Sequence, residues 1–159
     1  MTETPPNAPR QARVRVRAEL TREIKDVART QLAQRGAADL SLRAVARELG
    51  MVSSAVYRYF PSRDELLTAL IVDAYDAVGA AVEQAEATVR RNDLSGRWLA
   101  ACTAMRAWAR TNPQEYALIF GTPIPGYRAP TATIDPAARI PQVLLGIVAT
   151  AAAGRPGLS

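Results

Sequence analysis

The segment from Leu40 to Glu65 limits the possible folds of this 159-residue chain more than any other stretch of it. Two short helical patterns meet at Gly50, and a residue without a side chain permits the sharp turn that such a junction needs. The first pattern, Leu42 to Leu49, places its apolar residues on one face. The second must end before Pro61, because proline has no N–H and disfavours helix in the residue before it. The segment therefore predicts a helix-turn-helix.

Another helical pattern precedes this segment. Apolar residues recur at spacings of three and four from Leu20 to Leu32, and Gly36 is suited to a left-handed C-cap after them. Within the segment, Ser41 is expected to cap the second helix, and Ser53 or Ser54 the third. Three helices are thus expected in the N-terminal part of the chain.

The remainder of the chain shows helical signals and no strand pattern. Ser62 and Glu65 match a capping box, which predicts a fourth helix from Arg63 to about Arg90. Further helices are expected at Trp98 to Ala109, after the Asn-Pro-Gln-Glu sequence of residues 112–115, and between Asp135 and Ala153. We therefore predict an all-α fold that consists of a disordered basic arm (residues 1–17), a helix-turn-helix domain (18–62) and a helical regulatory domain (63–159).

Positive charge is concentrated in the first 60 residues. They hold 11 Lys and Arg against 6 Asp and Glu, whereas residues 61–159 hold 9 of each kind. This distribution indicates an N-terminal part that binds a polyanion and a C-terminal part with another role, although a solvated basic face is the alternative. The arginines of the arm could enter a minor groove, follow phosphates or form only a solubilising tail; they are Arg10, Arg13, Arg15 and Arg17.

The outer positions of the third helix carry hydrogen-bond donors and no acid. The donors are Ser53, Ser54, Tyr57, Arg58 and Tyr59, and no Asp or Glu lies between Glu48 and Asp64. Because an ordinary exposed helix mixes acids and bases, this surface favours contact with double-stranded DNA. The alternatives are an ordinary helical bundle and a helical protein-interaction module whose basic face binds an acidic partner without preference among DNA sequences.

The chain contains no His and one Cys, Cys102. A zinc site of the usual His/Cys kind and a Ser-His or Cys-His nucleophilic pair are therefore excluded, and Asp and Glu show no convergent pair. We accordingly expect no enzyme activity, no cofactor and no metal. The lone Cys fits a reducing cytoplasm. No apolar run reaches the roughly 18–20 residues that span a bilayer, so Val143 to Ala153 is expected to form a core helix and no membrane association is predicted.

The run from Ser41 to Leu67, and above all Y-R-Y-F-P-S-R-D-E-L-L at its end, resembles the DNA-binding domain of the TetR family of bacterial transcriptional regulators. The resemblance covers about residues 18–72 and is highly specific. It implies a three-helix N-terminal domain, a linking fourth helix and a divergent helical ligand-binding domain. It also implies a homodimer that binds a palindromic operator, usually represses, and releases DNA when a small molecule binds.

The resemblance further implies which side chains touch DNA. By position they are Arg43, Ser53, Ser54, Ala55, Tyr57 and Tyr59. Tyr57 and Tyr59 are expected on phosphates, and Arg63 takes the place usually held by Lys at the start of the fourth helix, where it could hold a phosphate. Arg43, the two serines and the Ala55 methyl group would read bases, although a phosphate contact alone is the alternative for Arg43.

Bulky side chains in the C-terminal half could line an apolar pocket between helices. The candidates are Trp98, Cys102, Met105, Trp108, Tyr116, Phe120 and Tyr127. A packed core is the alternative for each of them. Because few charges are available for such a pocket, we expect a small apolar or neutral effector.

The chain departs from the family pattern at its C-terminal end. Family members usually form a four-helix dimer interface from two final helices, whereas one helix follows the loop in this chain. We therefore expect either a truncated chain or a dimer with a reduced surface. That surface would use Val143, Leu144, Ile147 and Val148, for which packing within the monomer is the alternative.

Overall fold

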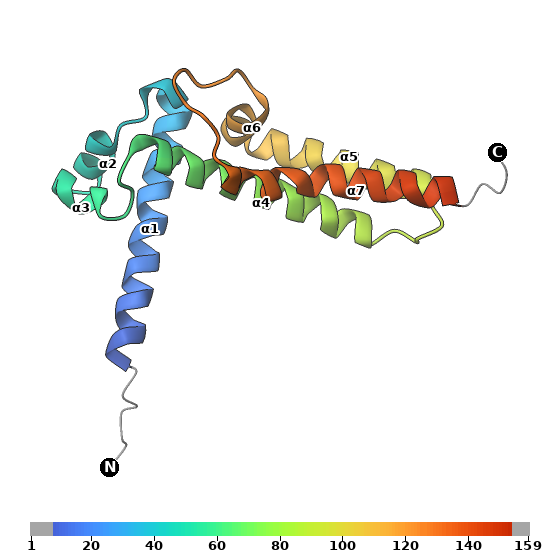
Figure 1. The fold of residues 1–159 in the computed structure, drawn as a ribbon, viewed down its shortest axis with the longest axis horizontal. Coiled ribbons are helices and arrows are strands. Elements are labelled where there is room, and N and C mark those ends of the chain that lie inside the picture. The colour runs from blue at the N-terminus through green and yellow to red at the C-terminus, as the bar shows by residue number, and fades with distance from the viewer. Residues whose placement is uncertain (1–7, 154–159) are drawn as a thin grey trace, which may run out of the picture. The chain divides into compact units, whose positions relative to one another are not determined.

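The computed structural model describes residues 8–153, and within this range the chain is helical and without β-strands (Figure 1). The helices are α1 (Ala8–Arg35), α2 (Leu42–Glu48), α3 (Ser53–Tyr57), α4 (Arg63–Ala87), α5 (Leu94–Thr111), α6 (Pro113–Phe120) and α7 (Ile134–Ala153), with short 3-10 helices η1 (Ala37–Asp39) and η2 (Thr131–Thr133). The predicted all-α class is confirmed. The chain divides into two compact units after Leu66, within the first turn of α4.

Helix α1 is longer than the sequence suggested. It begins at Ala8, so the prediction of a disordered arm is wrong for residues 8–17, and residues 1–7 of that arm lie outside the described residues. The segment contains no glycine, and Pro9 lies in the first turn, where its missing N–H is not needed. Arg, Gln and Ala are good helix formers, so the segment continues the helix although Pro9 to Glu19 are exposed.

The core of the first unit brings together the apolar faces of its helices. α2 packs on both α1 and α3 (Figure 1). The buried residues include Ile24, Ala28 and Leu32 of α1, Leu42, Val45 and Ala46 of α2, and Val56 with Phe60 around α3. The predicted inward faces of these helices are confirmed.

The turn between α2 and α3 is a Schellman motif. The N–H of Met51 donates to the carbonyl of Ala46 at 2.8 Å, and the N–H of Gly50 donates to that of Arg47 at 3.1 Å. Gly50 has a φ of 65°, a conformation that favours glycine. At the other end of α2, the Ser41 side chain accepts a hydrogen bond from the Ala44 N–H, as predicted. Local chemistry thus fixes both ends of α2.

A buried amide ties α1 to α2. The side chain of Gln31 is almost fully buried. Its amide nitrogen donates to a Glu48 carboxylate oxygen at 3.4 Å, and its amide oxygen accepts from the Ser41 N–H at 3.4 Å. Gln31 therefore holds both ends of α2 against the same position of α1.

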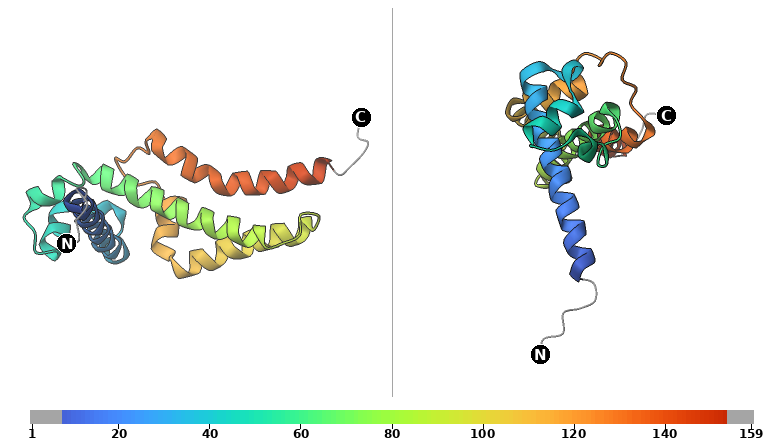
Figure 2. Two further views of the ribbon diagram at one scale, coloured as in Figure 1. Left: turned by 90° about the horizontal axis from the view of Figure 1, so that it is seen from below. Right: turned by 90° about the vertical axis from the view of Figure 1, so that its left-hand side faces the viewer.

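The second unit is built from long helices whose axes lie side by side (Figure 2). Figure 2 shows α4, α5 and α7 extending alongside one another. Their shared core contains Val78 and Val82 of α4, Ala101 of α5 and Ile140 of α7. Met105, Trp108, Ile119, Val143 and Leu144 pack against this core.

Two arginines connect these helices. Arg97 of α5 is 2% exposed and bonds Glu86 of α4 through Nε at 2.5 Å. Arg139 of α7 reaches Glu83 at 2.7 and 2.8 Å and Asp76 at 2.9 Å, all across to α4. The hydrogen bond from Arg139 holds the pKa of Glu83 below its ordinary value.

Helix α7 faces the core with one side and solvent with the other. By length and composition alone Thr131–Ala153 could cross a membrane, with a mean hydropathy of 1.3. The same helix carries Arg139, paired with α4, and buries Ile140 and Ile147, as expected of a helix packed in a bundle. Length and hydropathy are therefore weak evidence for a membrane here.

The packing of α7 also bears on the proposed dimer surface. Val143 and Leu144 pack against the core, and Ile147 is 4% exposed. The alternative of packing within the monomer therefore applies to these three residues. Val148 is 53% exposed and lies near Leu145, which is 66% exposed. Three of the four residues expected at a dimer surface therefore pack within the chain, Val143 and Leu144 with part of their surface still exposed.

Candidate nucleic-acid interface and cavity

The predicted reading residues lie on the surface of α2 and α3. Arg43 and Ser54 are exposed, Tyr57 is 41% exposed, and Ser53 and Ala55 are half-buried. Buried Val56 fixes the opposite face of α3, so its outer side is left to the serines and the tyrosine. A groove-reading helix needs this division between an apolar inner face and a hydrogen-bonding outer face.

The cap of α3 differs from the prediction. Val52 is the N-cap residue and makes no side-chain cap hydrogen bond, so the expectation that Ser53 or Ser54 caps the helix is wrong. The Schellman turn places the extended residue at Val52, one position earlier than the serines. The two serines therefore lie in the first turn, and their hydroxyl groups are not used as caps.

Tyr59 contacts an arginine that sequence reasoning did not connect with it. The guanidinium carbon of Arg17 lies 5.0 Å from the centroid of the Tyr59 ring, a cation–π distance. Arg17 Nη2 also donates to the carbonyl of Arg58 at 3.5 Å. The middle of α1 is thus attached to the end of α3, a contact over 41 residues of sequence that local patterns could not reveal.

Arg63, which is predicted to hold a phosphate, makes hydrogen bonds within the chain. Its Nη2 donates to the carbonyls of Ala37 and Ala38 at 2.8 and 3.3 Å, and its Nη1 lies 3.5 Å from Asp64. These bonds tie the start of α4 to η1. To bind a phosphate, the Arg63 guanidinium group would have to use its remaining N–H groups or give up these hydrogen bonds.

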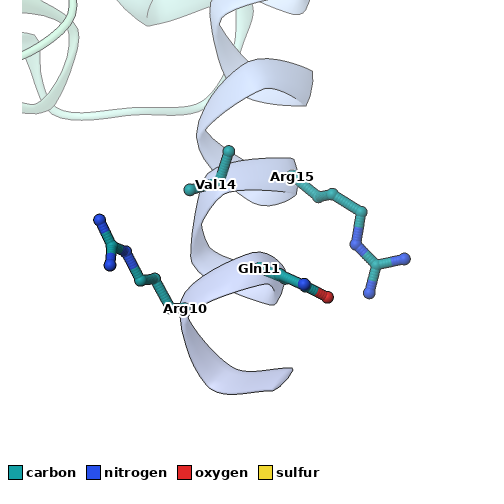
Figure 3. Close-up of a pocket in the computed structure, with 4 residues that line it drawn as sticks. All are labelled: Arg10, Gln11, Val14 and Arg15. Carbon is teal, nitrogen blue, oxygen red and sulfur yellow. The ribbon is translucent and has the colours of Figure 1, made fainter. Parts of the chain in front are cut away.

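The N-terminal half of α1 is a basic, exposed helix. Figure 3 shows Arg10 and Arg15 extending from opposite sides of it, with Gln11 and Val14 completing an open depression. Among the residues that the structure describes, those that line this depression all belong to α1. Its chemistry is that of a charged surface.

The second unit contains a cavity of about 640 Å³. It is lined by Ile71 and Tyr75 of α4, Leu118 and Ile119 of α6, residues of the 121–129 loop, and Thr133, Ile134, Ala137 and Ala138 around the start of α7. None of the described residues that line this cavity is charged. Its volume lies within the range of small-molecule sites.

Three hydroxyl groups of the cavity lining, those of Tyr75, Tyr127 and Thr133, have hydrogen-bond partners. The Tyr75 hydroxyl donates to the Ile119 carbonyl at 3.2 Å, and the Thr133 hydroxyl donates to that of Pro130 at 2.8 Å. The hydroxyls of Tyr127 and Thr68 share a hydrogen bond of 2.9 Å. The lining therefore offers mostly apolar contact.

Of the seven predicted pocket residues, Tyr127 lines this cavity and the other six do not. Met105 and Trp108 pack against the core, while Trp98 and Cys102 of α5 are exposed. Tyr116 and Phe120 are about 40% exposed, and their rings contact each other at a tilt of 49° with centroids 5.1 Å apart. Phe120 also meets Tyr75, a lining residue, edge to face at 5.9 Å. Four of the predicted residues lie on α5, which contributes none of the described lining residues, and the lining combines bulky residues such as Tyr75 with small ones such as Ala137.

The fold and these surfaces define a helix-turn-helix protein with an attached helical domain. Residues 24–70 match the family of bacterial regulatory proteins named tetR, and residues 98–158 match the tetracyclin repressor-like C-terminal domain. The HTH-type transcriptional regulators Rv1816 of Mycobacterium tuberculosis and Mb1846 of Mycobacterium bovis are each 51% identical over 114 residues. That match covers 72% of this chain and 49% of each relative, so the chain spans about half the length of these curated relatives.

Solved structures show the same fold. The structure of SCO4313, described as a candidate regulatory protein, matches with a TM-score of 0.75 at 47% sequence identity. The match covers 90% of this chain and 66% of the SCO4313 chain. A Rhodococcus sp. RHA1 protein of unknown function has a TM-score of 0.73 at 28% identity, covering 87% and 72%. The chain belongs to the TetR family of bacterial transcriptional regulators. This is a family of regulators and not of enzymes, in agreement with the prediction.

Proposed function

We propose that this chain is a ligand-responsive, cytoplasmic DNA-binding regulator that holds a palindromic operator as a homodimer and represses transcription. The observation that carries the proposal is the outer face of α3, where Ser54 and Tyr57 are exposed on a helix fixed from behind by buried Val56. Family membership supports the DNA-binding role.

In the proposed complex, α3 enters the major groove. Arg43, Ser53, Ser54 and Ala55 would contact base edges, and Tyr57 and Tyr59 would contact phosphates. Arg63 would contribute positive charge at the start of α4 while it keeps its hydrogen bonds to the carbonyl groups of η1. Two chains would place two α3 helices about one DNA turn apart, which requires an inverted repeat.

The proposed effector site is the uncharged cavity between α4, α6 and α7. Its lining fits a small, neutral, mostly apolar molecule. α4 contributes Ile71 and Tyr75 to that lining and begins in the first unit, so it is the natural element to carry a change from one unit to the other. The effector must bind the released state more tightly than the DNA-bound state by several kcal/mol.

The test is a selection of bound duplexes from a random-sequence pool, at two salt concentrations. The wild-type chain is expected to enrich an inverted repeat that survives the higher salt. Tyr57→Phe should weaken binding to the enriched duplex, because it removes one phosphate donor. Tyr116→Phe is the matched control, since Tyr116 is equally exposed but lies in the second unit. Sequence-blind binding that vanishes with salt would overturn the proposal in favour of a basic protein-interaction module.

A further inference from the structure

The N-terminal part of α1 is a charged helix that extends beyond its own unit's core. Figure 1 shows it running past α2 and α3. From Pro9 to Ala18 the segment contains four arginines and no acid, and these residues are exposed. The match to the family's DNA-binding domain begins only at residue 24, so that match gives this segment no role.

Three of the arginines share one face of the helix. At 100° per residue, Arg10, Arg13 and Arg17 fall within about 60° of one another, whereas Arg15 lies on the other side. Figure 3 shows this opposition for Arg10 and Arg15. The three therefore form a stripe, with Val14 beside it.

Contacts of Arg17 show which way the stripe faces. Arg17 lies over the Tyr59 ring and donates to the Arg58 carbonyl, so its face of α1 adjoins the end of α3. Arg10 lies seven residues further toward the N-terminus, a rise of about 10 Å. The stripe thus continues the proposed DNA-binding surface outward from Tyr59.

The helical form decides between two possible contacts with DNA. An α-helix with its side chains is about 10–12 Å wide, whereas the minor groove is about 6 Å wide. A helix of this kind does not insert into a minor groove as an extended arm can. Exposed guanidinium groups on it can instead pair with phosphates, often in a bidentate way.

We propose that Arg10 and Arg13 bind DNA backbone phosphates flanking the half-site that α3 reads. The proposal rests on the proposed function, because DNA held by α3 brings the flanking backbone to the stripe. Such contacts add affinity without base preference.

The test compares Arg10→Gln/Arg13→Gln with the wild-type chain on the enriched duplex between 50 and 200 mM salt. Glutamine keeps helix propensity close to that of arginine, and circular dichroism checks that the helix remains. Each phosphate that is no longer neutralised lowers the slope of log affinity against log salt by about 0.9. Because the variant removes two phosphate-binding cations from each chain, the fourfold rise in salt should cost the wild type about tenfold more affinity per chain than the variant.

The matched control is Arg106→Gln/Arg110→Gln, which removes the same charge from exposed positions of α5. Its slope should equal that of the wild type. A second arm shortens the duplex to the enriched repeat alone, and there the wild type should fall to the slope of the α1 variant. Equal slopes for the α1 variant and the wild type would overturn the proposal, as would an equal loss in both double variants. Failure of the wild type to prefer any sequence would instead refute the proposed function.

Discussion

The buried pair of Arg97 and Glu86 gives a sharp prediction about the stability of the second unit. The side chain of Arg97 is 3% exposed and that of Glu86 15%, and Arg97 also donates to the Arg91 carbonyl at 3.3 Å. Glu86→Leu leaves a buried guanidinium without its carboxylate and should cost about 3–5 kcal/mol of unfolding free energy. Arg97→Met should cost less, about 2 kcal/mol, because the more exposed carboxylate can recover water.

The double variant separates this account from simple loss of packing. Arg97→Met/Glu86→Leu removes both charges and should lie within about 1 kcal/mol of the wild type. Both tryptophans, Trp98 and Trp108, lie in α5, so their fluorescence during urea unfolding reports on the second unit. Asp76→Asn is the control, since its pair with Arg139 is half-exposed and should contribute less than about 1 kcal/mol. A double variant as unstable as the sum of the singles would refute the reasoning.

Three further predictions concern other sites. Gly50→Ala should lower the unfolding free energy by about 1–2 kcal/mol through backbone strain at a φ of 65°. A Cβ at this position meets no atom within 4 Å, so steric clash adds nothing to that loss. Urea unfolding followed by circular dichroism measures the loss, and an unchanged unfolding free energy would contradict the prediction. The stability that Arg139 gives through Glu83 should be present above pH 4.5 and lost as the pH falls through the lowered pKa, so the gap between the wild type and Arg139→Gln should narrow from pH 7 to pH 3 in urea titrations. A gap unchanged with pH would oppose that assignment. Ala138→Leu should fill part of the cavity and abolish the binding of neutral apolar compounds measured by calorimetry. Ala107→Leu, at an exposed position of α5, should leave that binding intact. Equal binding by both variants would exclude this cavity as the effector site.

Local sequence chemistry predicted much of the fold. The cap at Ser41, the positive φ at Gly50 and the bond from Glu65 N–H to the Ser62 hydroxyl at 3.1 Å are each set within a few residues. The buried faces of α1 to α3 followed from helical spacing in the same way. These features depend little on what the rest of the chain does.

The features that could not be predicted depend on distant parts of the chain. Arg139 meets Glu83 across 56 residues, and the cavity wall combines segments from Ile71 to Ala138. Helical periodicity places a residue on a face but does not say which faces meet. Residues of α5 were therefore assigned to a pocket that α4, α6, the following loop and the start of α7 line. The length of α1 was missed because no apolar stripe marks its exposed half.

The most direct test of the central claim is the ratio of dissociation constants for a scrambled and an enriched duplex at about 150 mM salt. The account predicts a ratio of about 10³ or more for the wild-type chain, as for specific DNA-binding proteins, and a marked fall for Arg43→Ala. Arg35→Ala, at the far end of α1, should keep the wild-type ratio. A wild-type ratio near one, with both affinities falling equally as salt rises, would contradict it.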